Sequence, residues 1–140
     1  MDFTIEKDEL FSTLSTLSKI NPSRTTLPIL STVLIKTKGT SGVSFRTTDL
    51  EIEMEIQCAS KNLKEGEVCA PIYKLLEIAN TINEKVVSIS VNETQRMRIN
   101  TETGKYVLMC NKTEEFPEER KINENITQIS TGFLKEAIQN

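Results

Sequence analysis

The sequence predicts an α+β domain in which two helices pack on antiparallel β-sheets. Most of the chain consists of short runs in which apolar and polar residues alternate, as they do along half-buried strands. Two segments, 7–18 and 71–82, instead space their apolar residues at the helical period. The resulting order is a strand, a helix and three strands, and it occurs twice. We therefore expect an internally duplicated architecture.

Length and charge set the broad class of the protein. A chain of 140 residues corresponds to one ordinary domain, or to one domain and a piece of another. It can bury a core without disulfides or a structural metal. The formal net charge is -3, from 17 basic and 20 acidic residues, so a nucleic-acid site would be a local basic patch on an acidic body.

The residue types argue against catalysis. The chain has no histidine and no Gly-rich phosphate loop, so we expect no enzyme, no metal and no cofactor. Cys58, Cys69 and Cys110 are widely spaced and are interpreted as small apolar strand residues in a reducing compartment. The sequence has no apolar run of the roughly 20 residues that a membrane span needs, and it starts without a basic signal segment. A cytoplasmic protein is expected.

The first unit begins with a strand, Phe3–Glu6, and a helix, Lys7–Ser18. Leu10, Leu14 and Leu17 lie at i, i+4 and i+7 and form one apolar stripe. The opposite side of the helix carries short polar side chains and one lysine, namely Ser12, Ser15, Thr16 and Lys19. The Glu-Lys ladder of an ordinary solvated helix is missing there.

A stiff connector, Asn21–Leu30, follows this helix. Arg24 lies between Pro22 and Pro28, and each proline biases the residue before it away from the helical conformation. The connector therefore presents one positive charge near the end of the helix. From the residues alone, Arg24 is either a solvated loop charge or a binding group.

Three strands complete the first unit, at Ile29–Lys36, Val43–Thr47 and Leu50–Gln57. In the third strand the apolar residues are expected to face the core and the glutamates to face water. The apolar residues are Leu50, Ile52, Met54 and Ile56, and the glutamates are Glu51, Glu53 and Glu55. Strand alternation explains the row of carboxylates better than a cation site does.

The second unit repeats the order. A short strand, Glu67–Ala70, leads into Pro71, which suits the first position of a helix. The apolar stripe of this helix is formed by Ile72, Leu75, Leu76 and Ala79. Three strands follow, at Val86–Val91, Arg96–Thr101 and Lys105–Cys110.

The remaining residues suggest a domain boundary. We expect one domain over residues 1–117, a charged linker over 118–125 and the start of a truncated second domain over 126–140. Thr127–Ser130 and the apolar residues of 133–138 repeat the pattern with which the chain opens. The chain is thus expected to be a fragment of a longer repeat protein.

Several short motifs occur in order along the whole chain. They are Phe3–Thr4, Arg24 with Thr26–Leu30, Thr48–Glu51 with Glu53–Met54, Pro71 with Lys74, Arg96–Met97, and Phe116–Pro117. Together they resemble the N-terminal domain of the bacterial DNA sliding clamp, the beta subunit of DNA polymerase III. The resemblance implies the DNA clamp fold and a processivity factor without catalytic activity.

The resemblance also implies a mechanism and a set of partners. Three such domains form a subunit, and two subunits close head to tail into a ring around duplex DNA, with the helices lining the hole. Polymerase and clamp loader bind between the second and third domains, which this chain lacks. A sliding surface should avoid base-edge contacts and rely on loose phosphate contacts, since tight contacts would fix its register on the DNA.

The resemblance assigns two groups of site residues. Arg24 matches a position that contacts DNA, and Tyr73 stands at a second such position, where arginine occurs in a well-known family member. The subunit interface is expected at the last strand, with Tyr106 and Leu108 on one side and Lys74, Arg96 and Lys105 as cationic partners. Ordinary sheet packing is an equal explanation for Tyr106 and Leu108. Thr103 stands where the pattern would place another basic residue.

One alternative function remains open at this stage. The same fold could serve as a stand-alone interaction module without ring-forming activity, because two domains are missing from the chain.

Overall fold

A computed structural model describes residues 1–20 and 28–118 and contains two α-helices and eight strands in these parts. The helices are α1 (Lys7–Ser18) and α2 (Ile72–Thr81). The strands are β1 (Asp2–Glu6), β2 (Thr32–Thr37), β3 (Ser41–Thr48), β4 (Glu53–Lys64), β5 (Glu67–Pro71), β6 (Val86–Val91), β7 (Arg96–Asn100) and β8 (Lys105–Met109). Two short 3-10 helices cover Pro28–Ser31 and Thr113–Glu115.

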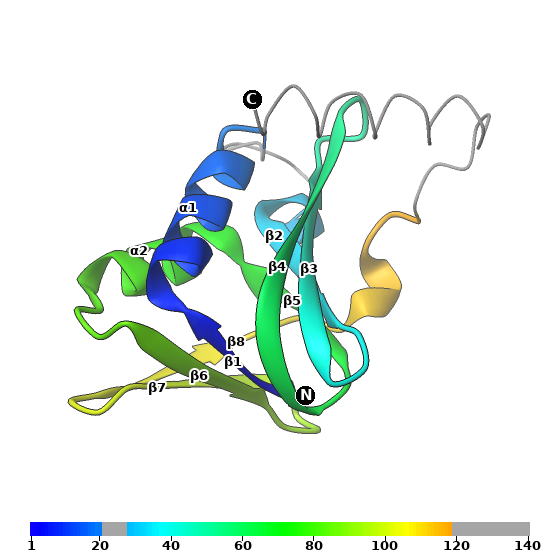
Figure 1. Cartoon of the computed structure of the whole chain (residues 1–140). Coiled ribbons are helices and arrows are strands. Elements are labelled where there is room, and N and C mark those ends of the chain that lie inside the picture. Colours follow the sequence, from blue (N-terminus) through cyan, green and yellow to red (C-terminus); the bar gives the residue numbers. More distant parts are fainter. Residues whose placement is uncertain (21–27, 119–140) are drawn as a thin grey trace.

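The eight strands form one antiparallel sheet in the order β5-β2-β3-β4-β1-β6-β7-β8 (Figure 1). β1 pairs with β4 of its own unit and with β6 of the other unit, so it joins the two halves of the sheet. β5 likewise pairs with β2 of the first unit, and Cys69 forms an isolated bridge to Asn111, just after β8. The expected α+β fold and the duplicated order of strand, helix and three strands are confirmed.

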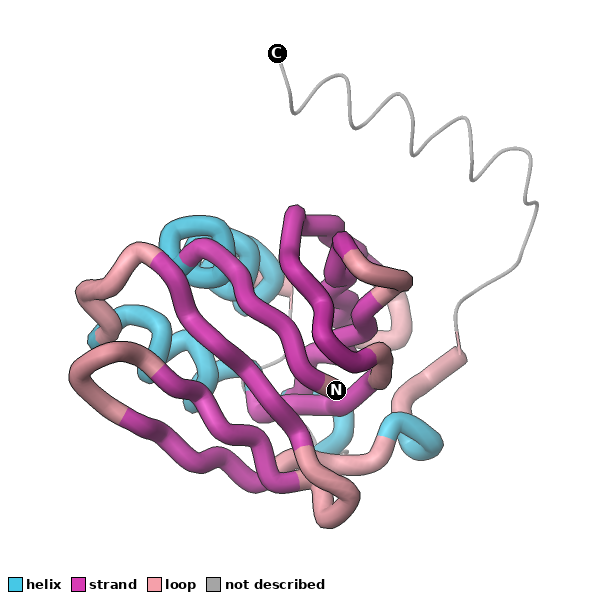
Figure 2. The backbone as a smooth tube through the Cα atoms, turned by 60° about the horizontal axis from the view of Figure 1, so that its bottom comes forward, coloured by secondary structure: helices cyan, strands magenta, loops and turns pink. Residues whose placement is uncertain are grey.

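Both helices lie on one face of the curved sheet, side by side (Figures 1 and 2). The predicted stripe of α1, Leu10, Leu14 and Leu17, is fully buried. α2 buries Ile72, Leu75 and Ala79. Facing them from the sheet are large side chains such as Phe3, Phe45, Ile89 and Ile99. Each such side chain contributes about 1.5–3 kcal/mol by leaving water, so this shared core holds helices and sheet together.

The boundaries of two predicted strands were wrong. The strand expected at Ile29–Lys36 begins only at Thr32, because a 3-10 helix precedes it and the Thr32 hydroxyl donates to the carbonyl of Ile29 at 2.6 Å. The strand expected at Leu50–Gln57 begins at Glu53 and continues to Lys64.

The residues before β4 form a tight turn instead of a strand. A carboxylate oxygen of Asp49 accepts hydrogen bonds from the backbone N–H groups of Glu51 at 2.9 Å and Ile52 at 2.6 Å. Leu50 has a φ of 80°, in the left-handed region. Leu50 and Ile52 are therefore exposed, and of the four apolar residues expected in the core only Met54 and Ile56 pack against it.

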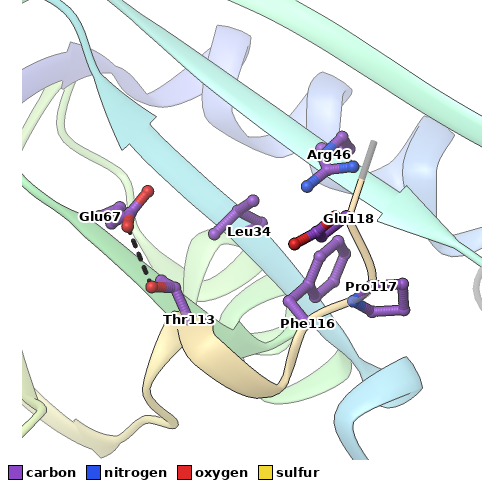
Figure 3. A pocket seen from close by; sticks show the side chains of 7 residues that line it. All are labelled: Leu34, Arg46, Glu67, Thr113, Phe116, Pro117 and Glu118. Carbon is purple, nitrogen blue, oxygen red and sulfur yellow. Dashed lines mark hydrogen bonds between the residues drawn. The ribbon is translucent and has the colours of Figure 1, made fainter. Parts of the chain in front are cut away.

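The segment after β8 crosses the face of the sheet that the helices leave open. There Leu34, Arg46 and Cys69 are register partners on three neighbouring strands. The segment is tied to them at Asn111 by the bridge to Cys69, and at Thr113, whose hydroxyl donates to Glu67 at 3.0 Å. Its last anchor is Phe116, which lies below the guanidinium of Arg46 with 4.9 Å between the guanidinium carbon and the ring centroid (Figure 3).

No helix in the described part of the chain is long and apolar enough to cross a membrane.

Candidate nucleic-acid interface

The solvent side of the two helices carries short polar side chains, and three of their hydroxyls donate hydrogen bonds to backbone carbonyls of the same helix. The Thr16 hydroxyl donates to the carbonyl of Ser12 at 2.9 Å, and the Ser18 hydroxyl donates to the carbonyl of Ser15 at 2.8 Å. On α2, the Thr81 hydroxyl donates to the carbonyl of Ile78 at 2.8 Å. None of these groups is a guanidinium that could form two parallel hydrogen bonds with one phosphate. The surface therefore suits transient contacts with a polymer more than contacts that fix its position along the polymer.

The helices themselves bring no excess of positive charge. Lys7 and Lys74 are the basic residues within α1 and α2, against the carboxylates of Asp8, Glu9 and Glu77. Attraction to a phosphate backbone scales with the number of cations that reach it. A net attraction therefore depends on cations outside the two helices, such as Lys19, which directly follows α1.

Tyr73 lies in the first turn of α2, at the point where this helix meets the end of α1. Its side chain is 40% exposed, and its hydroxyl donates to the carbonyl of Ser18 at 3.4 Å. The tyrosine thus bridges the two helices beside the start of the connector. Arg24, the other residue predicted to contact DNA, lies in segment 21–27, outside the described residues.

β8 is the last strand of the sheet, so one of its edges has no strand partner among the described residues. Tyr106 and Leu108 point to the helix side of this strand. Leu108 is only 7% exposed and belongs to the core, while the Tyr106 hydroxyl lies 3.2 Å from that of Thr81 on α2. Both residues therefore support the fold from the edge strand, whatever else they contact.

The three predicted cationic partners are all exposed. Arg96 and Lys105 lie on β7 and β8, while Lys74 projects from α2. Thr103, which replaces an expected basic residue, donates a hydrogen bond to the carboxylate of Glu84. That hydrogen bond holds the pKa of Glu84 below its usual value and ties the turn between β7 and β8 to the loop after α2.

Two exposed apolar residues at this edge were missed by the sequence reasoning. Val107 is 54% exposed and Met109 is 58% exposed, on the side of β8 that faces away from the helices. Strand alternation would have predicted them. If Tyr106 and Leu108 point to the core, the residues next to them in the strand, Val107 and Met109, must point outward.

The cysteines are not arranged for chemistry. Burial raises the pKa of the Cys69 thiol to about 11 and that of Cys110 to about 12, and it also raises the pKa of Cys58. Among the described residues, no group of three metal-ligating side chains converges.

Solved structures share this architecture. The DNA polymerase sliding clamp from Bacillus subtilis superimposes with a TM-score of 0.83 at 26% identity, over 89% of this chain and 34% of that one. The DNA polymerase III subunit beta from Pseudomonas aeruginosa gives a TM-score of 0.80 at 27% identity, over 87% of this chain and 33% of that one. A helix pair on a duplicated antiparallel sheet with an open edge defines a domain of the sliding-clamp class.

Sequence comparison identifies the family. The pattern of the family described as DNA polymerase III beta subunit, N-terminal domain, matches residues 1–120. The chain belongs to this family. It is 30% identical over 119 residues to the beta sliding clamp of Pseudomonas aeruginosa, covering 84% of this chain and 32% of that protein. It is 29% identical over 142 residues to that of Buchnera aphidicola, covering 99% and 38%. The chain thus spans about a third of the length of these relatives.

Proposed function

We propose that this chain forms the first domain of a DNA sliding clamp, the non-catalytic processivity factor that encircles duplex DNA and tethers the replicative polymerase. The observation that carries the proposal is the pairing of a helix layer on one face of the sheet with an open edge at β8. A domain of this kind can be joined edge to edge with others into a ring whose inner wall is helical. The alternative of a stand-alone interaction module is not favoured by the relatives.

In this proposal the helix layer faces the DNA. The hydroxyls of Thr16, Ser18 and Thr81 already donate to carbonyls of their own helices, so water rather than these side chains mediates much of the contact with phosphates. Arg24 and Tyr73 are the proposed DNA contacts. Tyr73 supports this role by lying beside the exit of α1, although its hydroxyl bonds to Ser18 in this structure.

The second part of the proposal concerns the ring. The open edge of β8 accepts a strand from a second subunit, which satisfies backbone groups that would otherwise face water. Lys74, Arg96 and Lys105 attract acidic residues of that subunit, while Tyr106 and Leu108 hold the edge strand against the core and border the contact.

Domain organisation and location follow from the same proposal. Residues 1–117 are the first clamp domain, 118–125 the linker and 126–140 the start of the second domain, where residues 119–140 lie outside the described part. Polymerase and clamp loader would bind through later domains, and the protein would act in the cytoplasm.

Charge reversal at the subunit edge tests this proposal. In a full-length subunit, Arg96→Glu combined with Lys105→Glu should convert rings into single subunits, because two attractive contacts become repulsive at each of the two interfaces. Sedimentation velocity measures the change. Lys36→Glu combined with Lys38→Glu makes the same change in charge at exposed sites that are not part of the proposed contact and should leave the rings intact. Rings that survive the reversal at β8 would contradict the proposed interface.

A further inference from the structure

The face of the sheet opposite the helices carries a cationic depression of about 500 Å³ near the N-terminus. Three basic side chains line it: Lys64, Arg96 and Arg98. Asp2 and Glu93 are the carboxylates in its lining, so basic side chains exceed acidic ones by one here, whereas the formal net charge of the whole chain is -3. Figure 2 shows the N-terminus on this face, with both helices behind the strands.

Strand register explains why these side chains share one face. Lys64 pairs with Asp2, Asp2 with Ser90, Ser90 with Arg98, and Arg98 with Val107, so these five residues form a row across five strands. Arg96 lies two residues before Arg98 and therefore points to the same side. The residues between and beside them, Met97 and Ile99, are fully buried on the helix side.

The three basic side chains are free to bind a partner. All three are exposed, and none forms an ion pair with a carboxylate in the described parts of the chain. In contrast, Arg46 on the same face is engaged with Glu53 and Phe116. The charges also stand on strands of a continuous sheet, so their spacing is set before a partner arrives.

The surface beside the arginines is apolar. Val107 and Met109 are the register partners of Arg98 and Arg96, and both are more than half exposed. A phosphate backbone has no apolar group that would cover them, whereas a peptide side chain does. Arg96 and Arg98 lie roughly 7 Å apart along the strand, which is also the spacing of alternate side chains on an extended peptide.

We propose that this surface, formed by Lys64, Arg96, Arg98, Val107 and Met109, binds an acidic segment of another protein in an extended conformation, with carboxylates on the arginines and apolar side chains on Val107 and Met109. The surface is separate from the helix layer. It shares Arg96 and strand β8, which carries Val107 and Met109, with the proposed subunit contact, so Lys64 and Arg98 distinguish the two.

Fluorescence anisotropy with this chain at low salt tests the proposal. The probe is a short labelled peptide in which glutamate alternates with leucine and serine, compared with the same peptide carrying glutamine for glutamate. The glutamate peptide should bind and the glutamine peptide should not. Lys64→Ala combined with Arg98→Ala should weaken binding about tenfold, since two partly exposed charge pairs are lost.

Two controls make the outcome decisive. Lys19→Ala combined with Lys85→Ala removes the same number of positive charges from exposed sites after α1 and before β6, outside this surface, and should leave peptide affinity unchanged. Circular dichroism and thermal unfolding show whether each variant is folded. Equal loss of peptide affinity in both double variants would show that affinity depends on the net charge of the chain and not on this surface, and would overturn the proposal. Competition with a short DNA duplex gives a second contradicting outcome. If the duplex displaces the peptide, and if the Lys64/Arg98 variant binds the duplex more weakly than the unchanged chain does, the surface binds polyanions generally and the proposal is overturned.

Discussion

Arg46 joins three parts of the domain that lie far apart in the sequence. It projects from β3, pairs with Glu53 at the start of β4, and lies over the ring of Phe116 after β8. The side chains of Arg46 and Glu53 are only 13% and 20% exposed, and Phe116 is 6% exposed. A cation between a carboxylate and an aromatic ring is stabilised by both. This residue therefore holds the segment after β8 against β3 and β4.

Arg46→Ala should lower the free energy of unfolding by about 2 kcal/mol, because Glu53 loses its partner and the Phe116 ring loses its cover. Urea unfolding of this chain measures the change. Arg98→Ala is the matched control: an exposed arginine on the same face that forms no ion pair with a described residue, whose removal should cost less than about 0.5 kcal/mol. Equal effects would show that the contacts of Arg46 add nothing to stability.

The buried thiols predict a dependence of stability on alkaline pH. The ordinary pKa of a cysteine thiol is 9.0, whereas burial raises the pKa of Cys69 in the folded chain to about 11, because it disfavours the charged thiolate. Between these values the folded state keeps a proton that the unfolded state has lost. The free energy of unfolding should therefore be unaffected by this group below pH 9 and should fall as the pH rises toward 11.

Urea unfolding across this pH range, with Cys69→Ala as the comparison, isolates the effect of the thiol. The variant is expected to show a shallower decline in stability than the unchanged chain. Parallel curves for the two proteins would refute the assignment to Cys69.

At the scale of elements, the turn before β4 decides which residues enter the core. The Asp49 carboxylate holds two backbone N–H groups, and Thr48 accepts a third from Leu50 at 3.0 Å. This local hydrogen bonding competes with strand pairing and prevails over the alternation of apolar residues. Leu50 is left exposed with a φ of 80°, a conformation that side chains other than glycine and asparagine adopt at a cost.

Leu50→Gly should therefore stabilise the domain, by up to about 1 kcal/mol, because the strain is relieved and little packing is lost. Leu63→Gly is the matched control, since Leu63 is 79% exposed within β4 and has no positive φ. That change should destabilise by about 0.5–1 kcal/mol. Thermal unfolding measures whether each variant is more or less stable than the unchanged chain. A loss of stability in both variants would show that Leu50 is not strained.

The same elements show what periodicity can and cannot predict. The helices were located correctly because each has a long apolar stripe, such as Leu10, Leu14 and Leu17, and the duplicated order followed from them. The start of β4 was missed because the hydrogen bonds of one aspartate are not visible in an apolar pattern. The bond between Tyr73 and Ser18 was missed for a related reason, since it joins residues 55 positions apart. The cationic row from Lys64 to Arg98 depends on strand order, which the sequence does not contain.

At the scale of the whole molecule, the chain on its own should bind duplex DNA weakly. Its helices carry no excess of basic residues, and a chain of 140 residues, about a third of the length of its relatives, is too short to encircle a duplex. In a full-length subunit, Arg24→Ala should lower DNA affinity and reduce the slope of log affinity against log salt by roughly one phosphate contact, about 0.9. Lys36→Ala serves as the control at an exposed site on the sheet. An unchanged slope in the Arg24 variant would show that Arg24 is a solvated loop charge that does not contact DNA.

Retention on circular DNA tests the central claim most directly, because a clamp is held by topology and not by affinity. The full-length subunit, placed by its clamp loader on a nicked circular duplex, should remain with the DNA during gel filtration in salt that abolishes ordinary phosphate binding, and should be released once the circle is cut. The 140-residue chain should be retained on neither form. Equal retention of the full-length subunit on circular and on linear DNA would contradict the account. So would retention of the 140-residue chain on circular DNA followed by its release when the circle is cut.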